Sequence, residues 1–468
     1  MNKIYSAATI FIFAINIAVA VFLFPSSAFA VPAFARQTGL ECTMCHVGAF
    51  GPQLTSYGRN FKLNGYVWGD EKKSVQDYLK GFSAMAEGGY EHSDGDLRKG
   101  AGLELDSTAN PPDNKQARYH TNDNVTVDQI SIFYGGQVYS NVGMLAQVTY
   151  NNATEQVTWD NSDLRYANGT QLAGKNLVYG VTVNNNPSVQ DVWQTTPAWG
   201  FPYISSAFLQ TPTASPYISG MAGTVAGAGV YGLWNDLVYA EISGYSTLPN
   251  SAQHAVGITG PDQSDHLSST APYWRLALQH DFGSHYVELG TYGIYADRYP
   301  GNVRDSGTDN FLDYALDATY QFTSADGKHN VSVYGTALHE RQNLAATFAS
   351  MGSANPTDNL TSLRASASYY YDNTYGLTFS PFSITGSADS VLYSNPTNSK
   401  PDTTGWTLQA DYTPTGRESS FGYPYLNVRY FVQYTAYSKF NGSSSNYDGT
   451  GRNASDNNLF FTGMWFAF

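Results

Sequence analysis

From residue 81 onward, hydrophobic and polar residues alternate in segments of about ten residues separated by turn residues, a pattern typical of transmembrane β-barrels. One segment places Leu312, Tyr314 and Leu316 on one face and Asp313 and Asp317 on the other. A period of two predicts a β-strand with one apolar face. We expect that face to contact lipid and the opposite face to line a polar lumen.

About sixteen such strands are predicted, an even number as in bacterial barrels. Short and long connections alternate, as expected for short periplasmic turns and long outside loops. The long connections include 185–220, and only 414–423 breaks the alternation. The aromatic end of the chain, with Phe468 last, resembles the C-terminal strand by which outer-membrane proteins are recognised; an array of soluble β-sandwiches is the alternative. The predicted strands are 81–91, 126–138, 141–151, 162–169, 174–184, 221–232, 236–246, 272–281, 284–296, 311–323, 329–341, 360–371, 375–388, 405–413, 424–438 and 456–468.

The composition agrees with a mainly β protein and excludes other classes. Of the 468 residues, 13% are charged and 15% aromatic, and the net charge is −14. Soluble domains carry about 25% charged residues. The acidic balance excludes a nucleic-acid surface, and two cysteines are too few for a disulfide framework.

The N-terminus is expected to direct export. An apolar run over 10–24 is followed by Pro25 and by the small-x-small sequence A-F-A that ends at Ala30. This order predicts a signal peptide over residues 1–30. The alternative is an uncleaved membrane anchor, because the run is nearly long enough to span a bilayer.

Both cysteines lie in the sequence C-T-M-C-H at 42–46, and C-x-x-C-H is the attachment signature of c-type haem. Thiols three positions apart share one turn and can bond the two haem vinyl groups, while the adjacent imidazole reaches the iron. We therefore expect one covalent haem c on Cys42 and Cys45, with His46 as proximal ligand. A zinc site lacks a second ligand pair, a redox dithiol lacks a βαβ context, and a disulfide leaves His46 unexplained.

Residues 31–80 are too few to enclose a haem in their own apolar core. A barrel of about sixteen strands has an open lumen. We therefore expect a monohaem cytochrome c domain (31–80) that plugs the lumen of a porin-like barrel domain (81–468).

The sixth ligand of haem iron in electron-transfer proteins is usually Met or His. Along the predicted strands, most Met and His side chains alternate outward. Met85 alternates inward with Ser83 and Glu87, which makes it the candidate distal ligand, with an open or water-bound site as the alternative. The pattern leaves several other residues open: Met221, His92, His120, His254, His266 and Met351.

The stretch 31–68 resembles the N-terminal domain of the fused monohaem cytochrome-porins of the outer membrane, a family that includes outer-membrane iron oxidases of iron-oxidising bacteria. The matching elements are P-A-F-A-R-Q-T-G (32–39) before the haem motif and F-K-L-x-G-Y (61–66) after it. The aromatic loop 184–203 also resembles a segment of these proteins. The resemblance implies oxidation of extracellular Fe(II), with electrons passed to a periplasmic c-type cytochrome or another soluble carrier.

The acidic character is compatible with this function. Fe(II) prefers carboxylate and water ligands, and acidic residues of the first long loop would concentrate cations: Asp94, Asp96, Glu104, Asp106, Asp113 and Asp123. As an enzyme, the protein would be an Fe(II) oxidase embedded in outer-membrane lipid. Two alternatives stay open: a haem-bearing porin for small solutes, and an exporter of electrons to an extracellular acceptor.

Overall fold

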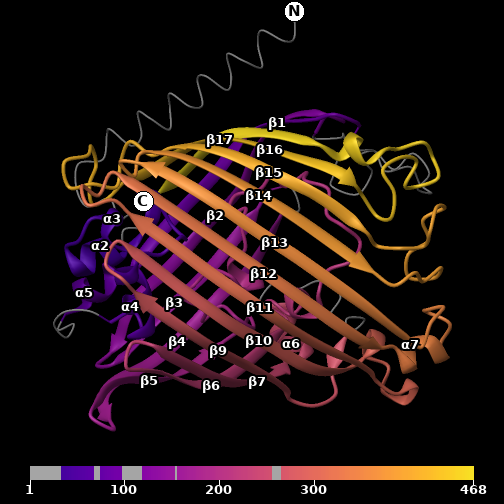
Figure 1. The fold of residues 1–468 in the computed structure, drawn as a ribbon, viewed down its shortest axis with the longest axis horizontal. Coiled ribbons are helices and arrows are strands. Elements are labelled where there is room, and N and C mark those ends of the chain that lie inside the picture. The colour runs from indigo at the N-terminus through magenta and orange to yellow at the C-terminus, as the bar shows by residue number, and fades with distance from the viewer. Residues whose placement is uncertain (1–32, 68–73, 97–118, 153–154, 256–264) are drawn as a thin grey trace, which may run out of the picture.

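The computed structural model describes residues 33–67, 74–96, 119–152, 155–255 and 265–468. They form an antiparallel β-barrel whose strands run obliquely around a lumen (Figure 1). The predicted signal peptide, residues 1–30, lies outside the described residues. None of the helices in the described ranges is both long and apolar enough to cross a membrane.

The strands predicted from the alternation are all present. The largest difference is at β4, which begins at Gln156 rather than 162, because a bulge between Ala146 and Val148 of its partner strand interrupts the alternation there. One short strand, β8 (His266–Leu267), was not predicted. The sixteen long strands are β1 (Phe82–Ser93), β2 (Asp123–Tyr139), β3 (Val142–Asn151), β4 (Gln156–Leu172), β5 (Lys175–Asn184), β6 (Val225–Trp234), β7 (Val238–Thr247), β9 (Ala271–Asp281), β10 (His285–Tyr299), β11 (Asp309–Thr323), β12 (His329–Asn343), β13 (Thr357–Tyr371), β14 (Tyr375–Gly386), β15 (Thr403–Tyr412), β16 (Asn427–Lys439) and β17 (Leu459–Ala467).

The barrel is closed. Each long strand pairs with the next long strand in the chain, and β1 also pairs with β17, from Met85 opposite Ala467 to Ser93 opposite Leu459. Closure leaves no free strand edge among these sixteen strands, which removes the template for edge-to-edge aggregation.

The two faces of the wall have the predicted character. On β11, Leu316 is 66% exposed on the outside, whereas Asp317 is 2% exposed on the inside. The same outward exposure of apolar side chains recurs around the barrel, at Val230, Ile242, Leu276, Leu278, Leu289, Leu363, Leu377 and Val432. An apolar outer band with a polar interior suits a barrel surrounded by lipid.

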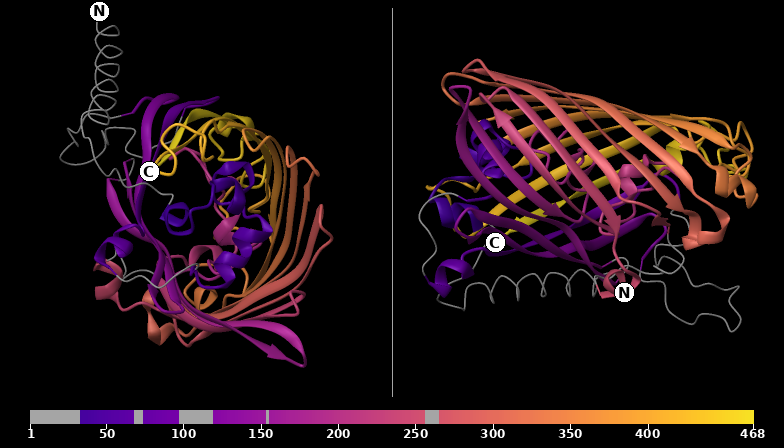
Figure 2. Two further views of the ribbon diagram at one scale, coloured as in Figure 1. Left: turned by 90° about the vertical axis from the view of Figure 1, so that its left-hand side faces the viewer. Right: turned by 90° about the horizontal axis from the view of Figure 1, so that it is seen from below.

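The helices are short. Those before β1 occupy one end of the barrel, and the others lie in connections between strands. Figure 2 shows the first of those before β1 inside the ring of strands, at the end where the short turns lie. The chain before β1 that lies in the lumen (33–67) is called the N-terminal segment below. The helices are α2 (Ala33–Thr38), α3 (Cys42–Cys45), η1 (Val47–Ala49), α4 (Ser56–Leu63), α5 (Val75–Leu79), η2 (Pro197–Trp199), η3 (Tyr217–Gly220), α6 (Asn250–Ala255), η4 (Pro300–Asn302), η5 (Arg304–Ser306), α7 (Ala345–Ala349) and η6 (Ala454–Asn457).

Hydrogen bonds fix the N-terminal segment to the inner wall. Arg59 Nη1 donates to Gln321 Oε1 at 2.6 Å, and the hydroxyl of Tyr231 donates to the carbonyl of Leu63 at 2.6 Å. Tyr66 donates to Asp163, whose carboxylate is buried in the wall. Partners on β4, β6 and β11 hold the segment on several sides, so it occupies part of the lumen at this end.

The connection between β5 and β6 differs from its predicted place outside the barrel. Residues 185–224, called the inward connection below, fold into the lumen, where Val189, Val192 and Trp193 are at most 1% exposed. Trp193 Nε1 donates to the hydroxyl of Tyr286 on the wall at 2.6 Å. The composition explains the difference, since a connection with many aromatic and few charged residues gains more from burial than from solvation.

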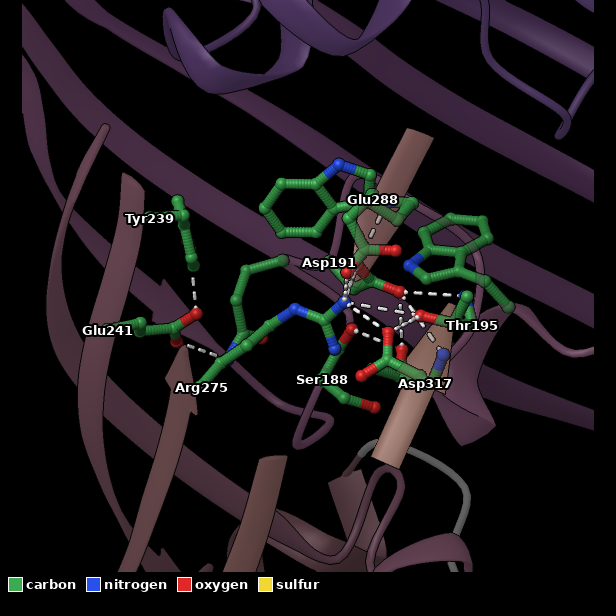
Figure 3. Close-up of polar contacts among 12 residues, drawn as sticks. Ser188, Asp191, Thr195, Tyr239, Glu241, Arg275, Glu288 and Asp317 are labelled. Atoms are coloured by element: carbon green, nitrogen blue, oxygen red, sulfur yellow. Dashed lines mark hydrogen bonds and ion pairs between the residues drawn. The ribbon is translucent and has the colours of Figure 1, made fainter. Parts of the chain in front are cut away.

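A buried ionic cluster anchors the inward connection (Figure 3). Arg275 Nη2 on β9 lies 2.7 Å from Asp317 on β11 and 3.4 Å from Asp191 of the connection. A third carboxylate, Glu288 on β10, lies 3.4 Å from the same nitrogen. One guanidinium thus joins three wall strands to the chain that crosses the lumen.

The exceptional long turn, 413–426, packs against the cysteine motif. The carbonyl of Gly416 accepts from the backbone N–H of Cys42 at 3.0 Å, and the N–H of Glu418 donates to Glu41 Oε1 at 2.8 Å. At the start of β16, Asn427 Nδ2 donates to the carbonyl of Ala49 at 2.7 Å. The extra length of this turn therefore serves to hold the N-terminal segment.

Candidate functional site

The cysteine motif forms a single helical turn. In α3, the N–H of His46 donates to the carbonyl of Cys42 at 2.8 Å, and the N–H of Thr55 donates to the carbonyl of Cys45 at 3.0 Å. Both cysteines carry free thiols. The turn places the two sulfur-bearing side chains and the imidazole on one short stretch of rigid backbone, as the spacing predicts.

Packing of α4 on this turn depends on a glycine. A Cβ at Gly58 would overlap the carbonyl oxygen of Cys45. Thr55 caps α4 by accepting from the N–H of Gly58 at 3.2 Å. The sequence T-S-Y-G after the motif therefore brings the first turn of α4 directly against α3.

Burial raises the pKa of the Cys42 thiol to about 12 and that of the Cys45 thiol to about 11. Cysteines that exchange disulfides have lowered pKa values instead. The environment is thus the opposite of that of a redox-active dithiol. In the described part of the chain, no group of three or more His, Cys, Asp or Glu side chains is arranged to hold a metal ion.

A large cavity lies between the N-terminal segment, the inward connection and the wall. It contains about 1800 Å³ of empty space, including its open mouth. Cys42, Cys45, His46 and Met85 all line it. The other lining residues come from the rest of the N-terminal segment, from β2, β3, β4, β16 and β17, and from the inward connection, so residues far apart in the chain enclose one space.

His46 points one edge of its ring into the cavity. Its Nδ1 is completely enclosed by protein, although the side chain is partly exposed. The accessible edge therefore carries Nε2. Burial lowers the pKa of His46 to about 4, so the imidazole is neutral at pH 7. A neutral imidazole is the form that ligates a metal.

Met85 lies on the inner face of β1, as its alternation predicts. It is 6% exposed and belongs to an apolar cluster with Phe50 of the N-terminal segment and Trp465 of β17. The rings of Phe50 and Trp465 lie 4.7 Å apart. Among the predicted distal candidates, Met85 alone lines the cavity; Met221, His92, His120, His254, His266 and Met351 do not.

These residues fit a c-type haem by the chemistry of their donor set. Two free thiols, a neutral imidazole and a thioether line one cavity whose walls also carry Phe34, Phe61, Phe133 and Trp465. Apolar walls of this kind suit a flat, largely apolar macrocycle, and Met opposite His is a common ligand pair in cytochromes c.

Lys62 and Gln194 are site residues that the sequence analysis missed. Lys62 Nζ donates to the carbonyls of Val189 and Asp191 at 2.8 and 2.7 Å, and lies 4.2 Å from the ring of Trp199. Burial lowers the pKa of Lys62 to about 7. Both residues line the cavity. In the sequence, the aromatic loop 184–203 was the feature that could have pointed to them, because the contacts of Lys62 and Gln194 arise when this loop folds into the lumen.

The acidic residues predicted to concentrate cations are only partly described. Asp123 accepts from the hydroxyl of Tyr90 at 2.6 Å and lies 2.9 Å from Nδ1 of His92. Asp94 accepts from Asn458 at 3.1 Å, in the region where the long connections lie. Glu104, Asp106 and Asp113 lie outside the described residues.

No protein-family model and no curated protein matches the sequence. Solved structures resemble the barrel at low sequence identity. They include the anion-selective porin from Comamonas acidovorans (9% identity, TM-score 0.43), the outer membrane channel DcaP of Acinetobacter baumannii (9%, 0.42) and OmpT, an outer membrane protein of Vibrio cholerae (10%, 0.40). The matches cover 83% of this chain and 98%, 96% and 96% of those chains.

Proposed function

We propose that this protein is an outer-membrane c-type cytochrome that carries electrons across the membrane, from extracellular Fe(II) to a periplasmic c-type cytochrome or another soluble carrier. The observation that carries the proposal is that Cys42, Cys45, His46 and Met85 line one cavity inside a closed barrel. In this proposal the signal peptide 1–30 directs export, and residues 31–80 form the haem domain.

Each residue has a defined part in the proposed site. Cys42 and Cys45 would hold the haem through thioether bonds, and His46, through Nε2, and Met85 would be the residues that ligate its iron. When bound, the haem supplies a one-electron centre whose iron alternates between Fe(II) and Fe(III). Phe50, Trp465 and the inward connection would shield the haem from part of the surrounding water, which would favour a high potential.

The position of the site in the barrel supports transfer from one side to the other. The cavity lies toward the short-turn end, which faces the periplasm in bacterial barrels. The long connections at the opposite end carry many carboxylates, including Asp265, Asp305, Asp389 and Asp448. With a net charge of −14, this end attracts hydrated Fe(II).

The test uses the full-length, haem-loaded protein in detergent, mixed anaerobically with Fe(II) in a stopped-flow spectrometer. Rapid appearance of the reduced haem bands is expected. The matched control, Cys42→Ala with Cys45→Ala, shows no such bands. A haem that only dithionite reduces would overturn Fe(II) oxidation and favour an exporter or a haem-bearing porin, which conductance in planar bilayers then separates.

A further inference from the structure

A second cavity adjoins the first on the other side of the inward connection. It contains about 550 Å³ of empty space, including its open mouth, and is lined by residues 194–201, Pro216 and Ser219 of the connection and by β10, β12, β13 and β14. None of its lining residues is acidic. This is unusual inside this barrel, where buried carboxylates such as Asp163, Glu241 and Asp317 are common.

Arg364 is the charged residue of this second cavity. On β13 it faces the lumen with the same parity as Ser362 and Ser366, and its side chain lines the cavity. It has no ion pair or hydrogen bond with any residue in the described ranges. By contrast, two other arginines on the inner wall are neutralised by carboxylates, Arg165 by Asp163 at 2.6 Å and Arg275 by Asp317 at 2.7 Å.

The neighbours of Arg364 offer further unused hydrogen-bond donors. The hydroxyl of Tyr292, a fully buried side chain that lines the cavity, has no hydrogen-bond partner in the described structure. The hydroxyls of Ser362 and Ser366 likewise bond no described residue. A guanidinium and three residues with unbonded hydroxyl groups, in one cavity whose described lining has no carboxylate, is the chemistry of an anion site.

We propose that Arg364, Tyr292, Ser362 and Ser366 form a binding site for one small oxyanion or carboxylate. Binding would pair the cation that the wall itself leaves unpaired, and would satisfy the buried hydroxyl of Tyr292. The guanidinium would supply two parallel N–H donors to two oxygens of the ligand.

Two sources of such an anion fit the geometry. Gly200 and Gln194 line both cavities, and a Cβ at Gly200 would come 3.0 Å from Arg364 Nη1. Only Gly200 therefore separates the guanidinium of Arg364 from the candidate haem cavity. A haem in that cavity would carry two carboxylate groups that the guanidinium could bind. The first source, a haem carboxylate, rests on the proposed function; the second, a free inorganic anion entering from the lumen, does not.

The experiment measures binding of inorganic phosphate by titration calorimetry to two full-length proteins in detergent. One is haem-loaded, and the other is the haem-free variant Cys42→Ala with Cys45→Ala; absorption spectra report the haem content independently. Binding to both identifies a free anion site. Binding to the haem-free protein alone identifies a haem carboxylate as the native occupant. Binding to neither overturns the proposal.

The variant Arg364→Gln should weaken phosphate binding at least about tenfold, because it removes the only cation of the cavity. Arg304→Gln, on the exposed helix η5, is the matched control and should leave binding unchanged.

If the haem-free protein does not assemble, the midpoint potential of the haem replaces calorimetry as the test of whether a haem carboxylate is bound. A lower potential in Arg364→Gln but not in Arg304→Gln supports a haem carboxylate; equal potentials, with no phosphate binding to the haem-loaded protein, overturn the proposal.

Discussion

Gln194 holds the backbone of Leu54 from across the lumen. Its Oε1 accepts from the N–H of Leu54 at 3.0 Å, and its Nε2 donates to the carbonyl of Pro52 at 2.8 Å. Leu54 in turn pairs with His46 in an isolated β-bridge. The inward connection thus positions the loop that lies beside the candidate iron ligand.

Replacing Gln194 with Ala should loosen this loop. Two partly buried backbone groups lose their partners, which destabilises the site by about 1 to 3 kcal/mol. The measurement is denaturant unfolding followed by haem absorption. Gln210→Ala, on the same connection but away from the loop, should change stability by less; equal losses in both variants would contradict a specific role of Gln194.

Met85→His should keep the ferric haem low-spin and lower its midpoint potential, because an imidazole stabilises Fe(III) more than a thioether does. Met85→Ala should give a high-spin spectrum. Both are measured by optical redox titration. The control is Met221→Ala, which removes a similarly buried Met from a different apolar cluster. An unchanged spectrum in Met85→Ala would show that another group, or none, ligates the iron.

Replacing both Cys42 and Cys45 with Ala should abolish covalent haem without preventing barrel assembly, because the strand pairing does not involve α3. Mass spectrometry and haem staining of denatured protein report attachment, and heat-modified gel mobility reports the folded barrel. Thr43→Ala, within the same turn, should retain the haem. Haem retained by the double variant would refute thioether attachment at these positions.

Replacing Gly58 with Ala should prevent α4 from packing on α3, since the added methyl group overlaps the carbonyl oxygen of Cys45. The expected result is a large loss of haem incorporation, measured as the ratio of haem absorbance to protein. Gly169→Ala, where nothing lies within 4 Å of the added carbon, is the control. Equal haem content in both would mean that the two helices can separate without consequence.

Arg275→Met should release the inward connection. It leaves three buried carboxylates without their cation, and breaking such a pair costs about 3 to 5 kcal/mol. Limited proteolysis should then cut within 185–224, and bilayer conductance should rise. Arg304→Met, on the surface, should do neither. An intact connection in Arg275→Met would assign its anchoring to other contacts, such as that of Trp193 with Tyr286.

The wall was predictable because each strand has one apolar face and one polar face. Alternation such as Leu316 beside Asp317 specifies which side chain points outward, and a shift by one residue would reverse every position. The same rule placed Met85 inside the barrel. Its presence in the cavity that Cys42 and His46 line could not be inferred from the sequence. Alternation tells which face of the wall a side chain is on, but not its position along the barrel axis or the residues that it contacts.

The interior was much less predictable. The inward connection has no periodicity, and its many aromatic residues identify it as apolar without saying where it is buried. Its position depends on single long-range contacts, such as Asp191 with Arg275 and Gln194 with Leu54, which lie far apart in the sequence. The sequence marks the connection 414–423 only as an exception to the alternation of short and long connections. Its contact with Cys42, which explains the exception, is evident only from the fold.

The seam between β1 and β17 has a consequence for folding. Every other pairing of long strands joins neighbours in the chain, so these hairpins form from local contacts, whereas the seam joins residues nearly four hundred positions apart, Met85 with Ala467. Closing so large a loop is the entropically costly event and comes late. Phe50 of the N-terminal segment packs with Met85 of β1 and Trp465 of β17, so the segment lies beside the seam. Pairing of the last strand, β17, with β1 therefore completes the wall of the cavity around the N-terminal segment.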